Sequence, residues 1–302
     1  MTALPVVLVR GLGDIGSAVA HRLFRDGYRV IIHDDPKPTT TRRGMAFADA
    51  AFDGGRATLE NIDARRADDL DTVTRLLGAR QAVPVYVRPI GPLLKVMQPE
   101  VLIDARMRKR SRPDVQRGLA PLTIGLGPNF EVGRTCDIAV ETSWERLGAV
   151  IIEGATMPLA GEPRSLGGHA RERYVYAPFD GIFQTRAHIG DVVSVDQDIA
   201  MIGFTALAAP VAGILRGLTH DGVPVTARTK VIEIDPRGAA AEIIGISERP
   251  RRIAEGVAAA IHVTRTVAKA FAPEDIKILT SKDPRYPRED QGSSPGPCRP
   301  RI

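Results

Sequence analysis

The pattern of apolar and polar positions changes character near residue 174. Before that point, short apolar runs alternate with segments whose apolar residues recur every three or four positions. The predicted strands are Pro5–Arg10, Tyr28–His33, Val83–Val87, Val101–Asp104, Leu122–Leu126 and Asp137–Glu141, and the predicted helices are Ile15–Arg25, Asp68–Leu77 and Ile90–Met97. Interleaved strands and helices favour a mainly parallel sheet with helices on both faces. We therefore expect an α/β fold that begins with a Rossmann-like nucleotide-binding domain over residues 1–155.

From residue 174 the sequence consists of short β-type runs separated by Gly, Asp and Pro, and these runs repeat. Ala177–Ile182 matches Ala209–Ile214 at an offset of 32 residues, and Gly190–Val193 matches Gly222–Val225 at the same offset. A repeat of this kind predicts a lipoyl/biotinyl-like, barrel-sandwich β-domain, which we place at residues 156–240. Carrier domains of that type hold their modified lysine on the hairpin between the halves. The corresponding segment here, Met201–Ala208, contains no lysine. Covalent lipoyl or biotin attachment is therefore excluded, and a docking, lid or assembly role is expected.

The last part of the chain carries one helical signal. Apolar residues recur at helical spacing within Ser247–Phe271, which predicts a C-terminal helix inside residues 241–280. Residues 281–302 are rich in Pro, Gly, Ser and charge, and they are expected to form a disordered tail.

A glycine motif stands between the first predicted strand and the first predicted helix. Its residues Gly11, Gly13, Asp14 and Gly16 are candidate ligand-binding positions, because a glycine turn at a helix N-terminus can bring backbone N–H groups to a phosphate. Asp34 ends the second predicted strand, where a carboxylate would meet a ribose hydroxyl. The alternative is a domain of this shape whose site is unused. No catalytic companion accompanies the motif: a Ser/Tyr-x-x-x-Lys signature and an obvious hydride-transfer histidine are both missing, so the catalytic residues are unknown.

Two further segments follow predicted strands and could face a ligand. Arg106 opens a basic run, Arg106–Arg110, directly after Val101–Asp104, and it is a candidate anion clamp. A solvated charged loop would explain the run equally well. Gly125 and Gly127 lie in a glycine turn after a buried strand and could present N–H groups, although a plain tight turn also accounts for them.

Composition argues against several further classes of function. The chain has 302 residues, a net charge of +5, 5% aromatic residues and two cysteines. A modest charge with few aromatics argues against nucleic-acid binding, and the absence of an apolar run of 18 residues argues against a membrane span. The six histidines are scattered without metal-ligand spacing, so no metal site is expected. The beginning of the chain lacks the features of a signal peptide, and we expect a cytoplasmic protein.

Several segments together resemble a known bacterial family. They are Val7–Ala20, Asp104–Met107, Ile124–Phe130, Ile151–Gly154, Gly167–His169 followed by Glu172 and Arg173, Ala177–Pro178, and Ile234–Gly238. This combination resembles the YqeB-like proteins of the selenium-dependent molybdenum hydroxylase system, an accessory family, over about residues 5–262. The chain departs from the pattern at Asn129, where a third glycine is usual.

The resemblance implies a role in maturation or cofactor supply of molybdenum hydroxylases of the xanthine dehydrogenase type. In that interpretation the client hydroxylase is the partner, and the glycine turn binds a small nucleotide-like ligand, either NAD or a pterin dinucleotide such as molybdopterin cytosine dinucleotide. The family's biochemical step does not follow from the resemblance. Two alternatives stay open, an NAD-dependent oxidoreductase and a scaffold without catalytic activity.

Overall fold

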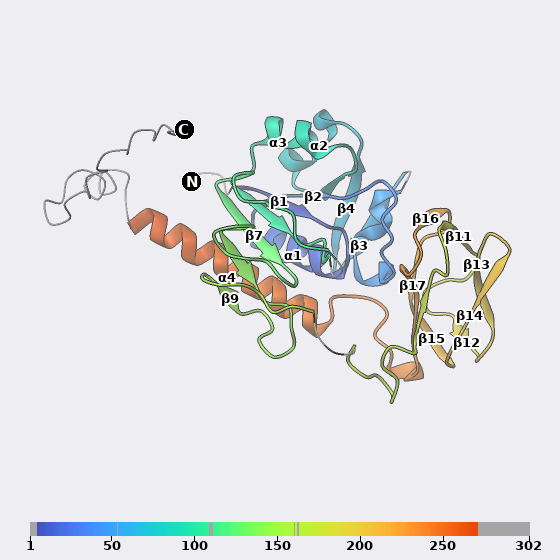
Figure 1. The fold of residues 1–302 in the computed structure, drawn as a ribbon. Helices are drawn as coiled ribbons and strands as arrows, with labels where there is room; N and C mark the ends of the chain where they lie inside the picture. Colours follow the sequence, from blue (N-terminus) through green and yellow to red (C-terminus); the bar gives the residue numbers. More distant parts are fainter. Residues whose placement is uncertain (1–4, 53, 109–110, 160, 162, 271–302) are drawn as a thin grey trace, which may run out of the picture. The chain divides into compact units, whose positions relative to one another are not determined.

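The structure is a computed structural model that describes residues 5–52, 54–108, 111–159, 161 and 163–270 (Figure 1). The chain divides into two units, Met1–Ala260 and Ile261–Ile302. All the sheets and the candidate site belong to the first unit. The expected disordered tail at 281–302 lies outside the described residues.

A nine-stranded sheet forms the first half of the chain, in the order β3-β4-β5-β2-β1-β6-β7-β8-β9 (Figure 1). Its strands are β1 (Val6–Arg10), β2 (Arg29–His33), β3 (Arg56–Leu59), β4 (Ile62–Ala67), β5 (Val83–Tyr86), β6 (Val101–Asp104), β7 (Leu122–Leu126), β8 (Ile138–Val140) and β9 (Val150–Ile151). The helices are α1 (Asp14–Arg25), α2 (Leu70–Ala79) and α3 (Ile90–Met97). Every helix and strand predicted for this region is present, with ends within two residues of the prediction.

The prediction of a Rossmann-like parallel-sheet domain is nevertheless wrong. The sheet is mixed, because β3 pairs antiparallel with β4 at one edge and β9 pairs antiparallel with β8 at the other. In the described residues no α-helix connects β6 to β7 or β7 to β8. Residues 105–121, between β6 and β7, contain five Arg and two Pro and carry no helical apolar stripe. The β3–β4 hairpin was missed because its turn residues, Glu60 and Asn61, adopt positive φ without being glycine.

Residues 174–235 form two four-stranded antiparallel sheets, with the orders β10-β17-β15-β12 and β14-β13-β11-β16. The strands are β10 (Tyr174–Tyr176), β11 (Gly181–Thr185), β12 (Val192–Val193), β13 (Asp198–Ile202), β14 (Thr205–Ala208), β15 (Gly213–Leu218), β16 (Val223–Val225) and β17 (Lys230–Asp235). Strands β11, β12 and β13 correspond to β15, β16 and β17 at the spacing of the sequence repeat. Each sheet therefore takes two strands from each half, and the halves interlock.

The core between these two sheets repeats as well. Its buried residues include the pairs Phe183 and Leu215, Val193 and Val225, Ile199 and Val231, and Ile202 and Ile234, each separated by the repeat length. Equivalent positions of the two halves thus fill one shared core. Neither half could bury its apolar residues alone.

The prediction of a barrel-sandwich domain that follows a Rossmann domain is also wrong. The two-sheet region does not stand apart as a carrier-type domain would, because it belongs to the same compact unit as the nine-stranded sheet. The Leu218 N–H donates to the Thr41 carbonyl at 2.8 Å, and Arg43 Nε donates to the Leu218 carbonyl at 2.8 Å. Thr41 and Arg43 lie in an irregular segment that includes the short helices η1 (Arg43–Met45) and η2 (Ala48–Ala51). No periodic pattern in that segment indicates the contact.

Helix α4 (Glu248–Ala270) confirms the helix predicted at Ser247–Phe271. Its first turns belong to the first unit, where Arg249 donates to the Thr142 carbonyl at 2.8 Å. No helix in the described part of the chain is long and apolar enough to cross a membrane.

Candidate ligand site at the glycine turn

The parallel strands bring the predicted ligand residues to one edge of the sheet. Arg10, the last residue of β1, pairs with His33 of β2 on one side and with Asp104 of β6 on the other, and Asp104 pairs with Gly125 of β7. The turns that follow these strands therefore meet at the same edge. The register thus brings these separate segments to one edge, and ligand binding by them stays a prediction.

The three glycines of the turn lie in different surroundings. A Cβ on Gly11, which has a φ of +113°, would lie 2.7 Å from the Ala105 carbonyl oxygen. A Cβ on Gly16 would lie 2.0 Å from the Gly11 carbonyl oxygen. Packing within the protein therefore requires glycine at both positions. A Cβ on Gly13 would meet nothing within 4 Å, and its φ of −69° is open to any residue.

The first turn of α1 leaves backbone N–H groups without partners. Gly13 is the N-cap residue and supplies no side chain to cap the helix. Asp34 accepts from the Leu12 N–H at 2.6 Å, and Asp14 accepts from the Ile15 N–H at 3.0 Å. Among the described residues, no group accepts from the N–H of Gly13 or Asp14. These donors, together with the helix dipole, favour an anion in the open space beside Gly13.

The two carboxylates of the site differ in electrostatic environment. Burial raises the pKa of Asp34, and the N–H groups of Asp35 and Leu12 offset this only in part. Burial also opposes ionisation of Asp14, but the charges of Arg42, 3.0 Å away, Arg249 and Lys230 together outweigh it and lower the pKa of Asp14. Asp14 is therefore held as a charged partner of Arg42, whereas Asp34 lacks a close cationic partner among the described residues.

Arg106 is less available to bind an anion than the sequence indicated. It forms ion pairs with Asp104 at 2.5 Å and with Asp114 at 3.0 Å, so its charge is largely neutralised by the protein itself. Arg10, which sequence reasoning missed, lies beside it. Arg10 donates to Gln116 at 2.7 Å, and its buried Nε has no partner in the described structure. Only the strand position of Arg10, directly before Gly11, could have drawn attention to it.

The second glycine turn has packing reasons of its own. A Cβ on Gly125 would lie 2.1 Å from the ring of Phe130, so glycine makes room for that ring. Gly127 has a φ of +117°, and its carbonyl accepts from Thr156 Oγ1 at 2.7 Å. Both are explained as elements of a tight turn, and a ligand contact by either stays a prediction.

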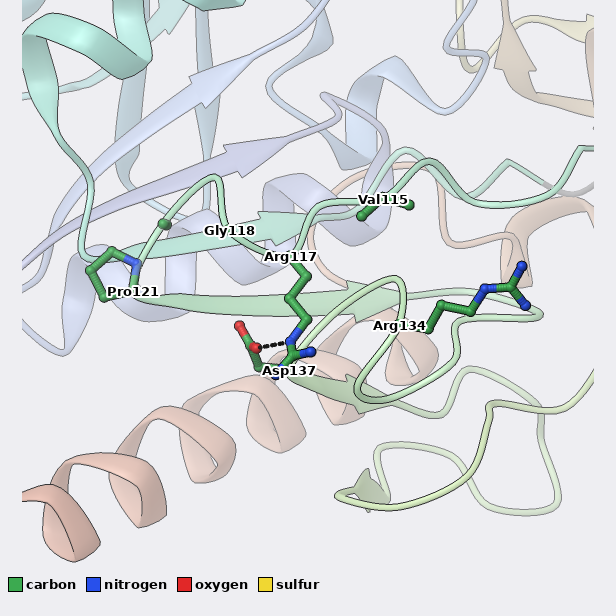
Figure 2. Close-up of a pocket in the computed structure, with 7 residues that line it drawn as sticks. Val115, Arg117, Gly118, Pro121, Arg134 and Asp137 are labelled. Carbon is green, nitrogen blue, oxygen red and sulfur yellow. Dashed lines mark hydrogen bonds and ion pairs between the residues drawn. The ribbon is translucent and has the colours of Figure 1, made fainter. Parts of the chain in front are cut away.

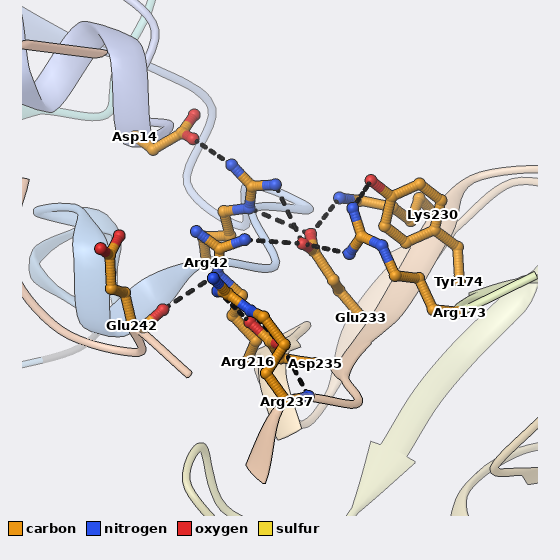
Figure 3. Close-up of polar contacts among 10 residues, drawn as sticks. All are labelled: Asp14, Arg42, Arg173, Tyr174, Arg216, Lys230, Glu233, Asp235, Arg237 and Glu242. Carbon is orange, nitrogen blue, oxygen red and sulfur yellow. Dashed lines mark hydrogen bonds and ion pairs between the residues drawn. The ribbon is translucent and has the colours of Figure 1, made fainter. Parts of the chain in front are cut away.

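A buried ionic cluster lies next to α1 (Figure 3). Glu233 lies on β17 and is fully buried. Its carboxylate forms ion pairs with the side-chain nitrogens of Arg42 at 2.9 Å, Arg173 at 2.8 Å and Lys230 at 2.8 Å. Arg216 lies 3.5 Å from the same carboxylate. Burial opposes ionisation of Glu233, but the charges of Lys230 and Arg42 outweigh it and hold its pKa well below the ordinary value.

Sequence reasoning missed this cluster, although a signal existed. At the repeat spacing, Glu233 and Arg216 correspond to Met201 and Gln184, which are paired neighbours on the other sheet. Both Met201 and Gln184 are exposed. The second half of the repeat thus carries charged residues where the first half carries Met201 and Gln184. This difference in sequence coincides with the outer face that the protein covers.

A surface cavity lies elsewhere, at the opposite edge of the sheet (Figure 2). It has a volume of about 540 Å³ and is lined by Val115, Arg117, Gly118, Ala120, Pro121, Arg134 and Asp137. Pro121 and Asp137 directly precede β7 and β8. Ligands of parallel sheets bind at the carboxyl ends of the strands, so this cavity is not the candidate site. Its two arginines are already engaged, Arg117 with Asp137 at 2.9 Å and Arg134 with Glu131 at 3.0 Å.

The described residues offer neither a metal centre nor an activated thiol. They contain no group of three or more His, Cys, Asp or Glu side chains that could hold a metal ion. Cys136 is fully buried, and burial raises the pKa of its thiol to about 11. A thiol of that kind is inert at neutral pH.

Comparison with known proteins gives one close relative. The chain is 38% identical over 259 residues to the uncharacterized protein YqeB of Escherichia coli strain K12. The similarity supports a YqeB-like family. It covers 85% of this chain and 47% of the relative, so the chain spans about half the length of YqeB. No protein-family model matches the chain. YqeB is itself uncharacterized, so the molybdenum hydroxylase connection gains no support from this relative.

Solved structures show only weak likeness. A succinylglutamate desuccinylase/aspartoacylase from Rhodobacter sphaeroides is 13% identical with a TM-score of 0.24, over 77% of this chain and 85% of that one. The ectoine utilization protein EutE from Ruegeria pomeroyi is 12% identical with a TM-score of 0.23, over the same shares. Similarity at this level carries no argument about fold or activity.

Proposed function

We propose that this protein binds a phosphate-bearing, nucleotide-like ligand at the glycine turn between β1 and α1. The N–H groups of Gly13 and Asp14 hold a phosphate, and Asp34 accepts from a hydroxyl of the same ligand. The site belongs to the class of helix N-termini that bind anions. A pterin dinucleotide or NAD would supply both groups.

Gly13 is the observation that carries the proposal. Gly11 and Gly16 are explained by contacts inside the protein, whereas a side chain at position 13 would meet neither steric nor conformational resistance. A Ser or Asp at this N-cap position would stabilise α1 by capping it. Gly13 provides no side-chain cap for α1 and leaves the space beside its Cα open. Close approach of a ligand to the backbone explains that choice.

Asp34 supports the same assignment. Its carboxylate already accepts from the Leu12 N–H, so it is fixed at the mouth of the turn. Burial raises its pKa, and the N–H donors of Leu12 and Asp35 offset this only in part, so further donors would stabilise the ionised form. Two ribose hydroxyls would provide such donors.

The test compares Gly13→Ala with Gly16→Ala. Gly13→Ala is expected to keep the wild-type melting temperature within about 2 °C, because its methyl group enters open space, and to lose ligand binding. Thermal shift with NAD, CTP and molybdopterin cytosine dinucleotide measures both effects. Gly16→Ala is the control that should destabilise the fold, because its Cβ would overlap the Gly11 carbonyl. Undiminished binding by Gly13→Ala, or no thermal shift of the wild type with any of the three, would sink the proposal.

The biological role that we propose is an accessory function in maturation or cofactor supply of a molybdenum hydroxylase. It rests on the motif resemblance and on the pairing of a ligand site with a lysine-free β-repeat. The exposed apolar residues of the repeat support docking of a client: Phe204 at the hairpin tip is fully exposed, and Met201 and Ile182 are about half exposed on the adjoining strands. Co-purification of a hydroxylase with wild-type protein, but not with Phe204→Ser, tests this role.

A further inference from the structure

We infer that Lys230 and Arg42 form a second oxyanion subsite beside the glycine turn, which takes a second phosphate group of the same ligand. This inference rests on the proposed function and extends it to a diphosphate. The first phosphate lies at the N–H groups of Gly13 and Asp14. The second lies at the partly exposed Arg42 and Lys230 of the Glu233 cluster, whose contacts are shown in Figure 3.

The two subsites are contiguous through Arg42. Its guanidinium donates to Asp14, the first residue of α1, at 3.0 Å and to Glu233 at 2.9 Å. Lys230 donates to the other oxygen of Glu233 at 2.8 Å. The Arg42 and Lys230 side chains are 22% and 30% exposed, whereas the Glu233 side chain is 0% exposed. Part of each cationic side chain therefore reaches solvent, whereas the carboxylate is fully covered.

The cluster carries more positive charge than it neutralises. Arg42, Arg173, Arg216 and Lys230 surround the single carboxylate of Glu233. Asp14 also pairs with Arg42, so these four cations face two carboxylates, and Asp235 is engaged by Arg237 at 2.7 Å. Uncompensated buried charge is costly, so a bound anion would complete the cluster.

Hydrogen-bond donors are also in excess. Each guanidinium and the ammonium carries several N–H donors and no acceptor. In the described residues their acceptors are the carboxylates of Glu233 and Asp14, the Tyr174 hydroxyl and the Glu242 carbonyl. The Nε of Arg173 is buried without a partner, and Arg173 lies 4.3 Å from the ring centre of Tyr174, the ring that Lys230 also faces. Phosphate oxygens are acceptors that match such a surplus.

The electrostatic environment of Lys230 and Arg216 agrees, whereas the burial of Arg42 is outweighed by the charges of Glu233 and Asp14, which raise its pKa. Burial lowers the pKa of Lys230, and repulsion by Arg42 adds to this despite the attraction of Glu233. Burial and then repulsion by Arg42 also lower the pKa of Arg216. A bound oxyanion would offset this repulsion and the cost of burying the two cations.

Inorganic pyrophosphate is the probe, and Lys230→Gln is the decisive variant. Isothermal titration of the full chain is expected to show pyrophosphate binding more tightly than orthophosphate at equal ionic strength, because two adjacent phosphates engage both subsites. Lys230→Gln should weaken pyrophosphate at least tenfold and leave orthophosphate within about threefold, because Gly13 and Asp14 still hold one phosphate. Lys95→Gln removes an exposed lysine on α3 and is the matched control, expected to match wild type. Lys230→Arg, which keeps the charge, should restore most of the pyrophosphate affinity.

The outcomes separate this inference from the proposed function. Nucleotide and pyrophosphate binding that Lys230→Gln leaves unchanged would overturn the second subsite while the glycine-turn site stands. Pyrophosphate binding that depends on Lys230 but not on Gly13, without nucleotide binding, would support the cationic subsite and contradict the proposed function. If Lys230→Gln lowers the melting temperature, Lys230→Arg in the same titration still decides the question, because equal weakening by both variants counts against a charge-based subsite.

Discussion

At the scale of single residues, the glycine turn shows how far sequence reasoning reaches. The sequence predicted a glycine turn between the first strand and the first helix, and the contacts of Gly11 and Gly16 explain why both must be glycine. It could not show that Arg106 is bound by Asp104 and Asp114, because those ion pairs depend on loop conformation after β6. A motif therefore identifies backbone requirements better than it identifies free charges.

Asp34→Asn is the residue-scale test of the ligand carboxylate. Asparagine keeps one acceptor, for the Leu12 N–H, loses the acceptor for the exposed Asp35 N–H, and removes a desolvated charge. The free energy of unfolding at pH 7 should therefore stay within about 1 kcal/mol of wild type. The pKa of Asp34 in the folded state lies above 3.8, so ionisation of Asp34 destabilises the folded state. The free energy of unfolding of the wild type should therefore fall, relative to the variant, as pH rises from about 4. Urea unfolding at pH 4 and pH 7 measures it. Nucleotide affinity should fall about tenfold, and an unchanged affinity would contradict the assigned role.

At the scale of elements, the two sheets of the β-repeat differ in whether the rest of the protein covers their outer faces. The inner faces share one core built from equivalent residues. The outer face of the sheet that contains β15 and β17 is covered, since Arg216 and Glu233 are buried there, whereas the outer face that contains β11 and β13 exposes Ile182 and Met201. The repeat in sequence predicted the shared core, but not which outer face would be covered.

Gly181 and Gly213 are equivalent positions that should respond differently to alanine. A Cβ on Gly213 would lie 2.4 Å from the backbone carbonyl oxygen of Asp235, which cannot move without shifting β17. A Cβ on Gly181 would lie 2.5 Å from a side-chain methyl of Ile202, which can adjust. Gly213→Ala should therefore cost about 2–3 kcal/mol of unfolding free energy, and Gly181→Ala about half as much. Denaturant unfolding of both variants measures the two losses. Equal losses of unfolding free energy would contradict the expectation that the Ile202 side chain adjusts more easily than the Asp235 backbone.

At the scale of the whole first unit, the nine-stranded sheet and the two-sheet region are joined through buried ions. Arg42 follows β2 in sequence and pairs with Glu233, which lies 191 residues away. Removing one partner of a buried ion pair costs more than the pair contributes, because the other charge is left unpaired. The cluster is therefore the contact whose loss should weaken the unit most.

Glu233→Gln should lower the free energy of unfolding at pH 7 by about 3–5 kcal/mol, because four cations lose their shared carboxylate. The pKa of Glu233 is depressed in the folded state, so the wild type has this stabilisation above pH 4.5 and loses it as pH falls further. The variant should show a smaller loss on acidification. Thermal unfolding between pH 3.5 and pH 7 measures both slopes, and parallel curves for the two proteins would contradict the assigned role of Glu233.

The sequence by itself determined the helices, the central strands, the glycine turn and the β-repeat, because hydrophobic periodicity and glycine requirements act over a few neighbouring residues. Tertiary structure alone decided that antiparallel strands extend both edges of the large sheet. It also decided that Arg106 is already paired, and that Arg42 reaches Glu233 to join the two regions of the first unit. Those features depend on burial and on pairing between residues that are distant in sequence, and no local pattern encodes which charge will face which.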